Sequence, residues 1–136
     1  MVTVPDSEGL PPVVRRFIDQ RIDNVEQLEI LLLLYREASR YWDVAAVAQA
    51  VYLTERSAEG HLETLAGRNL LDVRLTESVL YRFSPAPPEL TLDVKQLAES
   101  YRERRGELLA LLAPRRRKSL QDFSDAFRIS GGRKDG

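Results

Sequence analysis

The chain has 136 residues, 43% of them hydrophobic and 30% charged, which is the balance of an ordinary globular domain with room for a core. It has no cysteine, so disulfides, thiolate metal ligands and cysteine nucleophiles are excluded. The longest apolar run, residues 30–35, is too short to cross a bilayer, and residues 1–9 lack the regions of a secretion signal. We therefore expect a cytoplasmic protein.

The net charge of −1 does not by itself indicate a nucleic-acid-binding protein, but the charge is unevenly distributed. Residues 1–101 contain ten basic and sixteen acidic side chains, a net charge of −6. Residues 102–136 contain ten basic and five acidic side chains, a net charge of +5. The excess positive charge therefore lies near the C-terminus.

The first third of the chain predicts a tail and two helices. Three prolines and few large apolar side chains predict a mobile tail over residues 1–12. A first helix is expected over residues 13–22, where the apolar residues share one face. A second helix is expected to start at Asn24, which has capping-box spacing to Gln27, and to run to about Ser39.

Residues 43–67 have the pattern of two short helices separated by a turn. Asp43 and Thr54 are suitable N-caps, because their side chains can accept hydrogen bonds from free amides of the first turn. Behind each cap, apolar residues recur at helical spacing and define an inward face. These residues are Val44, Val47, Ala48 and Val51 in the first helix, and Ala58, Leu62, Leu65 and Ala66 in the second. Gly67 and Asn69 are the expected terminators, since both tolerate positive φ.

Beyond Asn69 the hydrophobic period changes from 3.6 to 2, which predicts two strands joined by a turn at residues 76–78. The alternating apolar residues are Leu71, Val73 and Leu75 in one strand and Val79, Tyr81 and Phe83 in the other. Three prolines in residues 84–88 exclude a helix or an interior strand there and predict a stiff connector.

The order helix, turn, helix, hairpin is that of a winged helix-turn-helix. The pattern Thr54, Ala58, Leu62, Leu65 and Asn69-Leu70-Leu71, followed by Tyr81-Arg82-Phe83, resembles winged-helix bacterial transcriptional regulators of the MarR type. Many such proteins have glycine where Asn69 stands, but asparagine can also adopt the left-handed conformation. The resemblance covers about a third of the chain. It implies a mostly α fold with a small β-hairpin wing (α+β), extra N- and C-terminal helices, and a short strand near Trp42 that pairs with the hairpin.

A long helix is expected over residues 91–112, with Thr91 as its N-cap and Asp93 in its first turn. A heptad-like stripe along it contains Val94, Leu97, Tyr101, Leu108 and Leu111. This stripe could pack on its own domain, but regulators of this type commonly dimerise through helices outside the motif, so we interpret it as a homodimer interface. A last helix, residues 119–129, is expected to dock through Phe123 and Phe127 within a single domain spanning residues 13–130, before a frayed end.

Helical geometry at about 100° per residue separates an inward apolar face of residues 54–68 from an outward face. Outward arginine and hydroxyl side chains can contact phosphates or bases, and glycine allows close approach. The candidate DNA contacts on this face are Arg56, Ser57, Gly60, Thr64 and Arg68. Arg74, near the tip of the hairpin, is expected to touch the DNA backbone.

Two further charged groups bear on DNA binding. The basic run near the C-terminus fits either a solvated linker or a phosphate-contacting segment, and we include its arginines, Arg115, Arg116 and Arg117, among the candidate DNA contacts. The opposing group is an acidic row on one flank of the second motif helix, formed by Glu55, Glu59 and Glu63. Because carboxylates repel phosphates, this row predicts weak binding to DNA or binding to another ligand.

Residues for catalysis are scarce. His61 is the only histidine, and with no cysteine no cluster of histidine, cysteine and carboxylates supplies three metal ligands. No glycine-rich phosphate loop follows a strand, and no serine lies in a nucleophile elbow. We therefore expect no enzyme activity, cofactor or metal. The favoured function is a dimeric DNA-binding transcriptional regulator. The alternative is a winged-helix protein–protein interaction module whose acidic helix contacts a basic partner.

Overall fold

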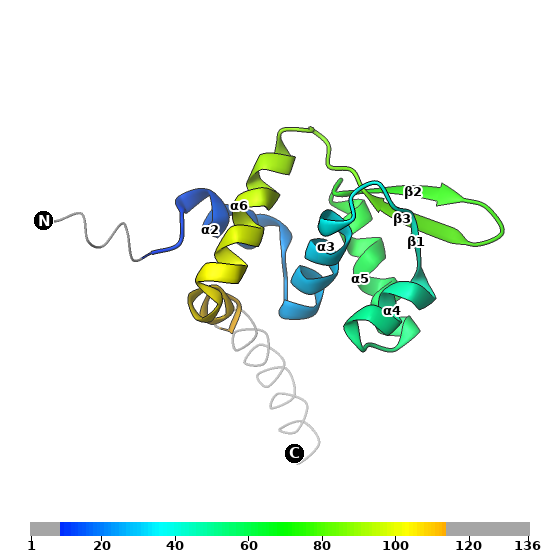
Figure 1. Cartoon of the computed structure of the whole chain (residues 1–136), viewed down its shortest axis with the longest axis horizontal. Coiled ribbons are helices and arrows are strands. Elements are labelled where there is room, and N and C mark those ends of the chain that lie inside the picture. The colour runs from blue at the N-terminus through cyan, green and yellow to red at the C-terminus, as the bar shows by residue number, and fades with distance from the viewer. Residues whose placement is uncertain (1–8, 114–136) are drawn as a thin grey trace, which may run out of the picture.

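The computed structural model describes residues 9–113, which form a group of helices with a small antiparallel sheet at one end (Figure 1). The elements in chain order are α2 (Pro12–Arg21), α3 (Val25–Arg36), β1 (Trp42–Asp43), α4 (Val44–Val51), α5 (Glu55–Gly67), β2 (Leu71–Leu75), β3 (Val79–Phe83) and α6 (Leu90–Glu103). A further helical stretch, residues 105–113, ends the described part. This order confirms the predicted α+β winged helix-turn-helix. Among these residues no helix has the length and apolar character needed to span a membrane.

The helix-turn-helix forms where the predicted caps place it. The Asp43 carboxylate accepts a hydrogen bond from the Ala46 amide at 2.7 Å, and the Thr54 hydroxyl accepts one from the Ser57 amide at 3.1 Å. Asn69 takes a φ of 65°, so it ends the α5 segment in the left-handed conformation expected of it. Gly67, the other expected terminator, is simply the last helical residue, and no described glycine has a positive φ.

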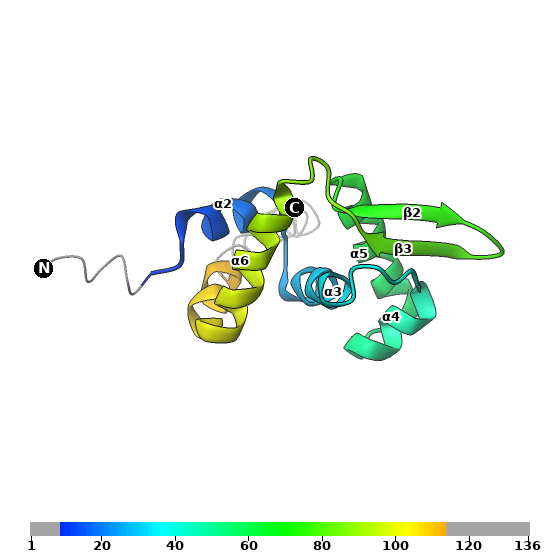
Figure 2. The same ribbon diagram turned by 45° about the horizontal axis from the view of Figure 1, so that its top comes forward.

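The sheet has the strand order β1-β3-β2, with both pairs antiparallel. Trp42 in β1 lies opposite Tyr81 in β3, which confirms the short strand expected near the tryptophan. Both side chains are buried, at 4% exposure each. The β2–β3 hairpin extends away from the helices, and Figure 2 shows it at the opposite end of the molecule from α2 and α6. The wing therefore has a buried base and an exposed tip.

One hydrophobic core contains side chains from all of these helices and strands. Helix α3 lies between the α2–α6 pair and the unit formed by α4, α5 and the sheet (Figures 1 and 2). The ring of Tyr35 in α3 meets that of Phe83 in β3 edge to face, with centroids 5.3 Å apart. The start of α3 is fixed by Asn24, whose side chain accepts from the Gln27 amide at 2.9 Å. Helix α3 thus joins the two halves of the molecule.

The long helix predicted over residues 91–112 is not continuous. Helix α6 begins at Leu90 without a side-chain cap, one residue before the expected cap Thr91, and the chain leaves the helical conformation at Arg104, with φ −134°. The carbonyl of Arg104 then accepts the first bond of the next helical stretch, from the Leu108 amide at 3.0 Å. Leu108 and Leu112 are fully buried in the core beyond this break. We attribute the break in the helix at Arg104 to the burial of these two leucines.

Other expected boundaries need smaller corrections. Leu10, assigned to the mobile tail, is 7% exposed and belongs to the core. Helix α3 ends at Arg36, before the expected Ser39, because a turn closed by the Arg40 amide and the Glu37 carbonyl leads into β1. The expected docking helix, residues 119–129, lies outside the described residues, as do Arg115, Arg116 and Arg117.

Candidate nucleic-acid interface

The outward face of α5 carries four of its five candidate contacts. Arg56, Ser57 and Gly60 are exposed, and Thr64 is half-buried. A Cβ atom added at Gly60 would meet no atom within 4 Å, so nothing in the described residues requires a glycine there. Glycine inside a helix costs about 1 kcal/mol relative to alanine. Its presence leaves the backbone of α5 open to close approach from outside.

Arg68, the fifth candidate on α5, does not face outward. Its Nη1 donates to the carbonyl oxygen of Arg21 at 2.7 Å, and its Nη2 pairs with the Asp23 carboxylate at 3.0 Å. Both partners lie in or just after the last turn of α2. Arg68 therefore fastens the end of α5 to the α2–α3 connection, which corrects its predicted position on the outward face. The helical angle alone placed Arg68 on the outward face and could not reveal these partners.

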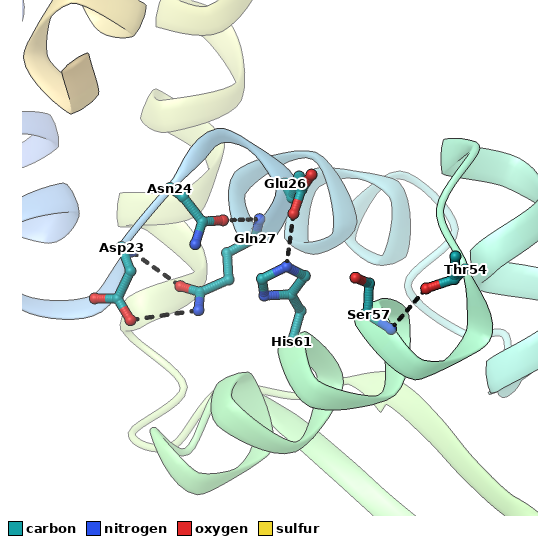
Figure 3. Close-up of polar contacts among 7 residues, drawn as sticks. All are labelled: Asp23, Asn24, Glu26, Gln27, Thr54, Ser57 and His61. Atoms are coloured by element: carbon teal, nitrogen blue, oxygen red, sulfur yellow. Dashed lines mark hydrogen bonds and ion pairs between the residues drawn. The ribbon is translucent and has the colours of Figure 1, made fainter. Parts of the chain in front are cut away.

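His61 lies on the same flank of α5 as Arg68. Its Nε2 is 3.0 Å from the Glu26 carboxylate in the first turn of α3, and Figure 3 shows the ring directed at that carboxylate. No group of three potential metal ligands occurs among residues 9–113. We call this side of α5, where His61 and Arg68 attach the helix to its neighbours, the anchored flank.

The opposite flank of α5 carries the acidic row, Glu55, Glu59 and Glu63, all exposed. Burial raises the pKa of Tyr81 in β3, and the negative charges of Glu63 and Glu59 raise it further. Glu59 and Glu63 of this row therefore lie on the flank of α5 that is near Tyr81 of the wing. Within residues 9–113 none of its three carboxylates forms a hydrogen bond or salt bridge. We call this the acidic flank.

The two faces of the wing differ. On the face that carries Tyr81, apolar residues continue to the tip, where Val73 is 44% and Leu75 is 77% exposed. Because Val73 pairs with Tyr81, this exposed apolar surface lies on the side of the wing that faces the acidic flank of α5. An acidic surface therefore adjoins an apolar one.

The other face of the wing carries a cluster that we call the Tyr41 platform, formed by Tyr41, Asp72, Arg74 and Arg82. The guanidinium carbons of Arg74 and Arg82 lie 4.4 and 4.7 Å from the centre of the Tyr41 ring. The Tyr41 hydroxyl donates to the Asp72 carboxylate at 2.8 Å, and Arg82 lies 3.8 Å from the same carboxylate. Of these four residues the sequence pointed only to Arg74. The period-2 alternation of the two strands was the available signal, since it places residues 72, 74 and 82 on one face.

The residues expected in a dimer interface are mostly buried within one chain. Val94, Leu97 and Leu108 have no exposed surface, which is the packing that the alternative interpretation of the stripe expects. Tyr101 is half-buried, and its hydroxyl donates to Glu29 at 3.1 Å. Burial together with the bond to Glu29 raises the pKa of Tyr101. Leu111 is half-buried and lines an open hollow with Leu10, Arg15, Glu107 and Ala110.

No protein-family model matches the chain, and no curated protein matches it either. Solved structures do. A variant of MepR from Staphylococcus aureus bound to an oligodeoxyribonucleotide is 14% identical, with a TM-score of 0.53 over 86% of each chain. MepR itself, a transcription regulator of the multidrug efflux pump MepA, is 15% identical, with a TM-score of 0.51 over 86% of this chain and 89% of its own. A homodimeric DNA-binding domain from Mycobacterium bovis, a possible ArsR-family regulator, is 23% identical, with a TM-score of 0.49 over 65% and 81%. The chain shares the winged helix-turn-helix fold of MepR, in agreement with its resemblance to winged-helix regulators.

Proposed function

We propose that the protein is a DNA-binding transcriptional regulator that acts as a dimer and reads duplex DNA with the outward face of α5. The observation that carries this proposal is the exposure of Arg56, Ser57 and Gly60 on the second helix of a helix-turn-helix. The fold shared with MepR supports it, because a MepR variant is known in complex with an oligodeoxyribonucleotide. The proposal follows from position and chemistry, since fold alone does not fix function.

The α5 helix would enter the major groove, which is wide enough for an α-helix. Arg56 can donate two parallel hydrogen bonds to guanine or bind a phosphate, and Ser57 can donate to either. Gly60 would let the helix backbone approach the bases. Because Arg68 is committed to the anchored flank, Arg56 is the main cation of α5 that is available to DNA. Further positive charge would come from Arg74 on the wing and from Arg115, Arg116 and Arg117.

The test is a selection of duplexes from a random-sequence pool at low salt, followed by mobility-shift titrations of the selected duplex. Arg56→Ala should weaken binding by about 1–3 kcal/mol, the range for one good contact to a base. Arg16→Ala is the matched control, because it removes the same charge from an exposed position on α2. The proposal fails if the selection enriches no sequence, or if the two variants weaken binding equally.

The dimer part of the proposal depends on a surface other than the buried stripe of α6. The open hollow lined by Leu10, Arg15, Glu107, Ala110 and Leu111 has a volume of about 340 Å³ and is the candidate contact. In light scattering at tens of micromolar we expect a dimer that Leu111→Glu dissociates. Leu92→Glu, the same change at an exposed leucine outside this hollow, should leave the dimer intact. A monomeric wild type would refute the dimer and leave the proposed DNA contacts of α5 untouched.

A second candidate function rests on a separate observation. The acidic flank of α5 lies beside the exposed apolar surface of Val73 and Leu75, and this combination fits a basic protein partner better than a phosphate backbone. The two functions predict opposite effects for Glu59→Gln and Glu63→Gln. Removing these charges should strengthen binding to DNA and weaken binding to a basic protein.

A further inference from the structure

The acidic flank of α5 and the adjoining face of the wing form one exposed surface that combines negative charge with apolar side chains. Helix α5 contacts β2 of the wing, and the charges of Glu59 and Glu63 act on Tyr81. Tyr81 pairs with Val73, and Leu75 continues the same face of the wing at 77% exposure. A ligand that covers this surface therefore has to bring positive charge and apolar side chains together.

The negative charge of this surface has no counter-charge among residues 9–113. Glu55, Glu59 and Glu63 form no hydrogen bond or salt bridge there. Carboxylates one helical turn apart destabilise a helix slightly, and they also repel phosphates. They nevertheless lie beside the exposed face of α5 that carries Arg56 and Gly60. This arrangement is accounted for if the acidic flank has a positively charged ligand of its own.

Residues 114–136 of the same chain have the complementary charge. They contain seven basic and three acidic side chains, a net charge of +4, whereas residues 1–113 have a net charge of −5. Four of the basic side chains are consecutive, at positions 115–118. We call these four residues the basic run.

The same segment also has the apolar side chains. Leu120, Phe123 and Phe127 follow the basic run at helical spacing and give the helix expected over residues 119–129 one apolar face. A basic run followed by an apolar face matches an acidic flank followed by the apolar face of the wing. Segment and surface are thus complementary both in charge and in their order.

The chain is long enough for this contact. Phe123 follows Ala113, the last described residue, by ten positions. Ten extended residues span at most about 33–36 Å, and about 26 Å if residues 119–123 are helical. These lengths are comparable with the diameter of a small domain, about 30 Å. The segment can therefore extend toward the wing, which lies at the opposite end of the molecule from α2 and α6 (Figure 2).

We infer that residues 115–127 dock on this surface when DNA is absent, with the basic run on the acidic flank and the two phenylalanines on the apolar face of the wing. The inference rests on the proposed function, because it assigns a form of regulation to the same α5 site. A docked segment covers the flank beside Arg56 and Gly60. Its basic run cannot neutralise the carboxylates of α5 and the phosphates of DNA at once, so docking and DNA binding compete.

The first test detects the docked segment in the full chain without DNA. Because the chain has no cysteine, Gln121→Cys provides a single site for a nitroxide spin label, on the side of the expected helix away from the phenylalanines. The label should broaden the amide NMR signals of Glu63, Val73 and Leu75. Broadening confined to α2 and α6, next to the end of the described chain, would overturn the inference.

Matched variants of the labelled chain identify the contacts. Phe123→Ser with Phe127→Ser removes the apolar face of the segment and should abolish the broadening, and Glu59→Gln with Glu63→Gln should reduce it. Ile129→Ser is the control, because it removes an apolar side chain from the opposite face of the expected helix and should leave the broadening unchanged. If thermal unfolding shows that the phenylalanine variant does not fold, the variant of the exposed glutamates decides. Wild-type broadening in that variant, or in a folded phenylalanine variant, contradicts the docking.

The second test measures the competition with DNA, in the unlabelled full chain and with the selected duplex. Only the undocked fraction binds, so a docked population of about 70–90% weakens the apparent affinity about three- to tenfold. Phe123→Ser with Phe127→Ser should recover this factor, and Ile129→Ser should not. An unchanged or weaker affinity of the phenylalanine variant would overturn the inference. If neither the wild type nor this variant binds a duplex, the proposed function fails instead, and the spin-label test still decides the docking.

Discussion

The two flanks of α5 use their polar side chains differently. On the anchored flank, Arg68 binds the end of α2 and Asp23, and His61 contacts Glu26 of α3. On the acidic flank, Glu59 and Glu63 face the wing without a hydrogen bond or salt bridge among the described residues. A charge on the anchored flank therefore belongs to the fold, and a charge on the acidic flank is available to whatever binds α5.

The largest effect that this comparison predicts is on stability. Arg68→Ala should lower the free energy of unfolding by about 1–2 kcal/mol, because a part-buried charged group loses two hydrogen bonds. Arg56→Ala removes the same side chain from the exposed face and should change it by less than about 0.5 kcal/mol. Urea denaturation of both variants measures the difference. Equal midpoints would show that Arg68 does not fasten α5.

The next effect concerns the acidic flank. The double variant Glu59→Gln, Glu63→Gln should raise the affinity for the selected duplex by about three- to tenfold at low salt, with little change in stability, since exposed charges contribute about 0.2–1 kcal/mol each. Mobility shifts at low and high salt measure it, and the gain should shrink as salt screens the charges. Weaker binding by this variant would mean that the two carboxylates make favourable contacts to the DNA.

Gly60 lies between the two flanks. Its substitution should change the stability of the fold and the affinity for DNA in opposite directions. Gly60→Ala should raise the free energy of unfolding by about 0.5–1 kcal/mol, because the helical site has open space and glycine is a poor helix former. The added methyl group should weaken binding to the selected duplex if the backbone of α5 approaches the bases. A variant that gains stability and keeps full affinity would exclude such close approach.

The smallest effect is on the ionisation of Tyr81. Its pKa lies above the usual value of 10.0 because of burial, then Glu63 and then Glu59. The Glu59→Gln, Glu63→Gln variant should lower this pKa but leave it raised, since burial remains. The pKa of Tyr101 should not respond, because its causes are burial, Glu29 and Arg105. Carbon-13 NMR of the tyrosine rings resolves the two. An unchanged Tyr81 would mean that the acidic flank does not face the wing.

The same shift fixes the sign of a pH effect on stability. A raised pKa means that folded Tyr81 holds its proton more tightly than unfolded Tyr81 does, so stability falls as pH rises. This contribution is complete below pH 10 and is lost as the pH passes through the pKa of the folded state. Removing the charges of Glu59 and Glu63 should reduce that loss.

The parts of the fold that depend on neighbours in sequence were predictable. The caps Asp43 and Thr54, the left-handed Asn69 and the alternating strands each follow from a few adjacent residues, and the structure confirms them. The break at Arg104 was not predictable, because it depends on how the following leucines reach a core built from distant elements.

The candidate site, like the fold, could be predicted only where it depends on neighbouring residues in the sequence. Helical geometry placed Arg56, Ser57 and Gly60 on an exposed face. It could not show that Arg68 reaches Arg21, 47 residues earlier in the chain. Nor could it show that Tyr41 and Asp72, 31 residues apart, share a hydrogen bond. Side chains near the border of a face need the positions of other elements before their role is known.

In the proposed function, the outward face of α5 and the wing meet DNA, and α2 does not. The most direct measurement is a titration of isotope-labelled protein with the selected duplex, followed by amide NMR shifts. We expect shifts at Arg56, Ser57, Gly60 and Arg74, and none at Arg15 and Arg16 on α2. Shifts confined to α2 and α6, or no shift at a concentration where the mobility assay shows binding, would contradict it.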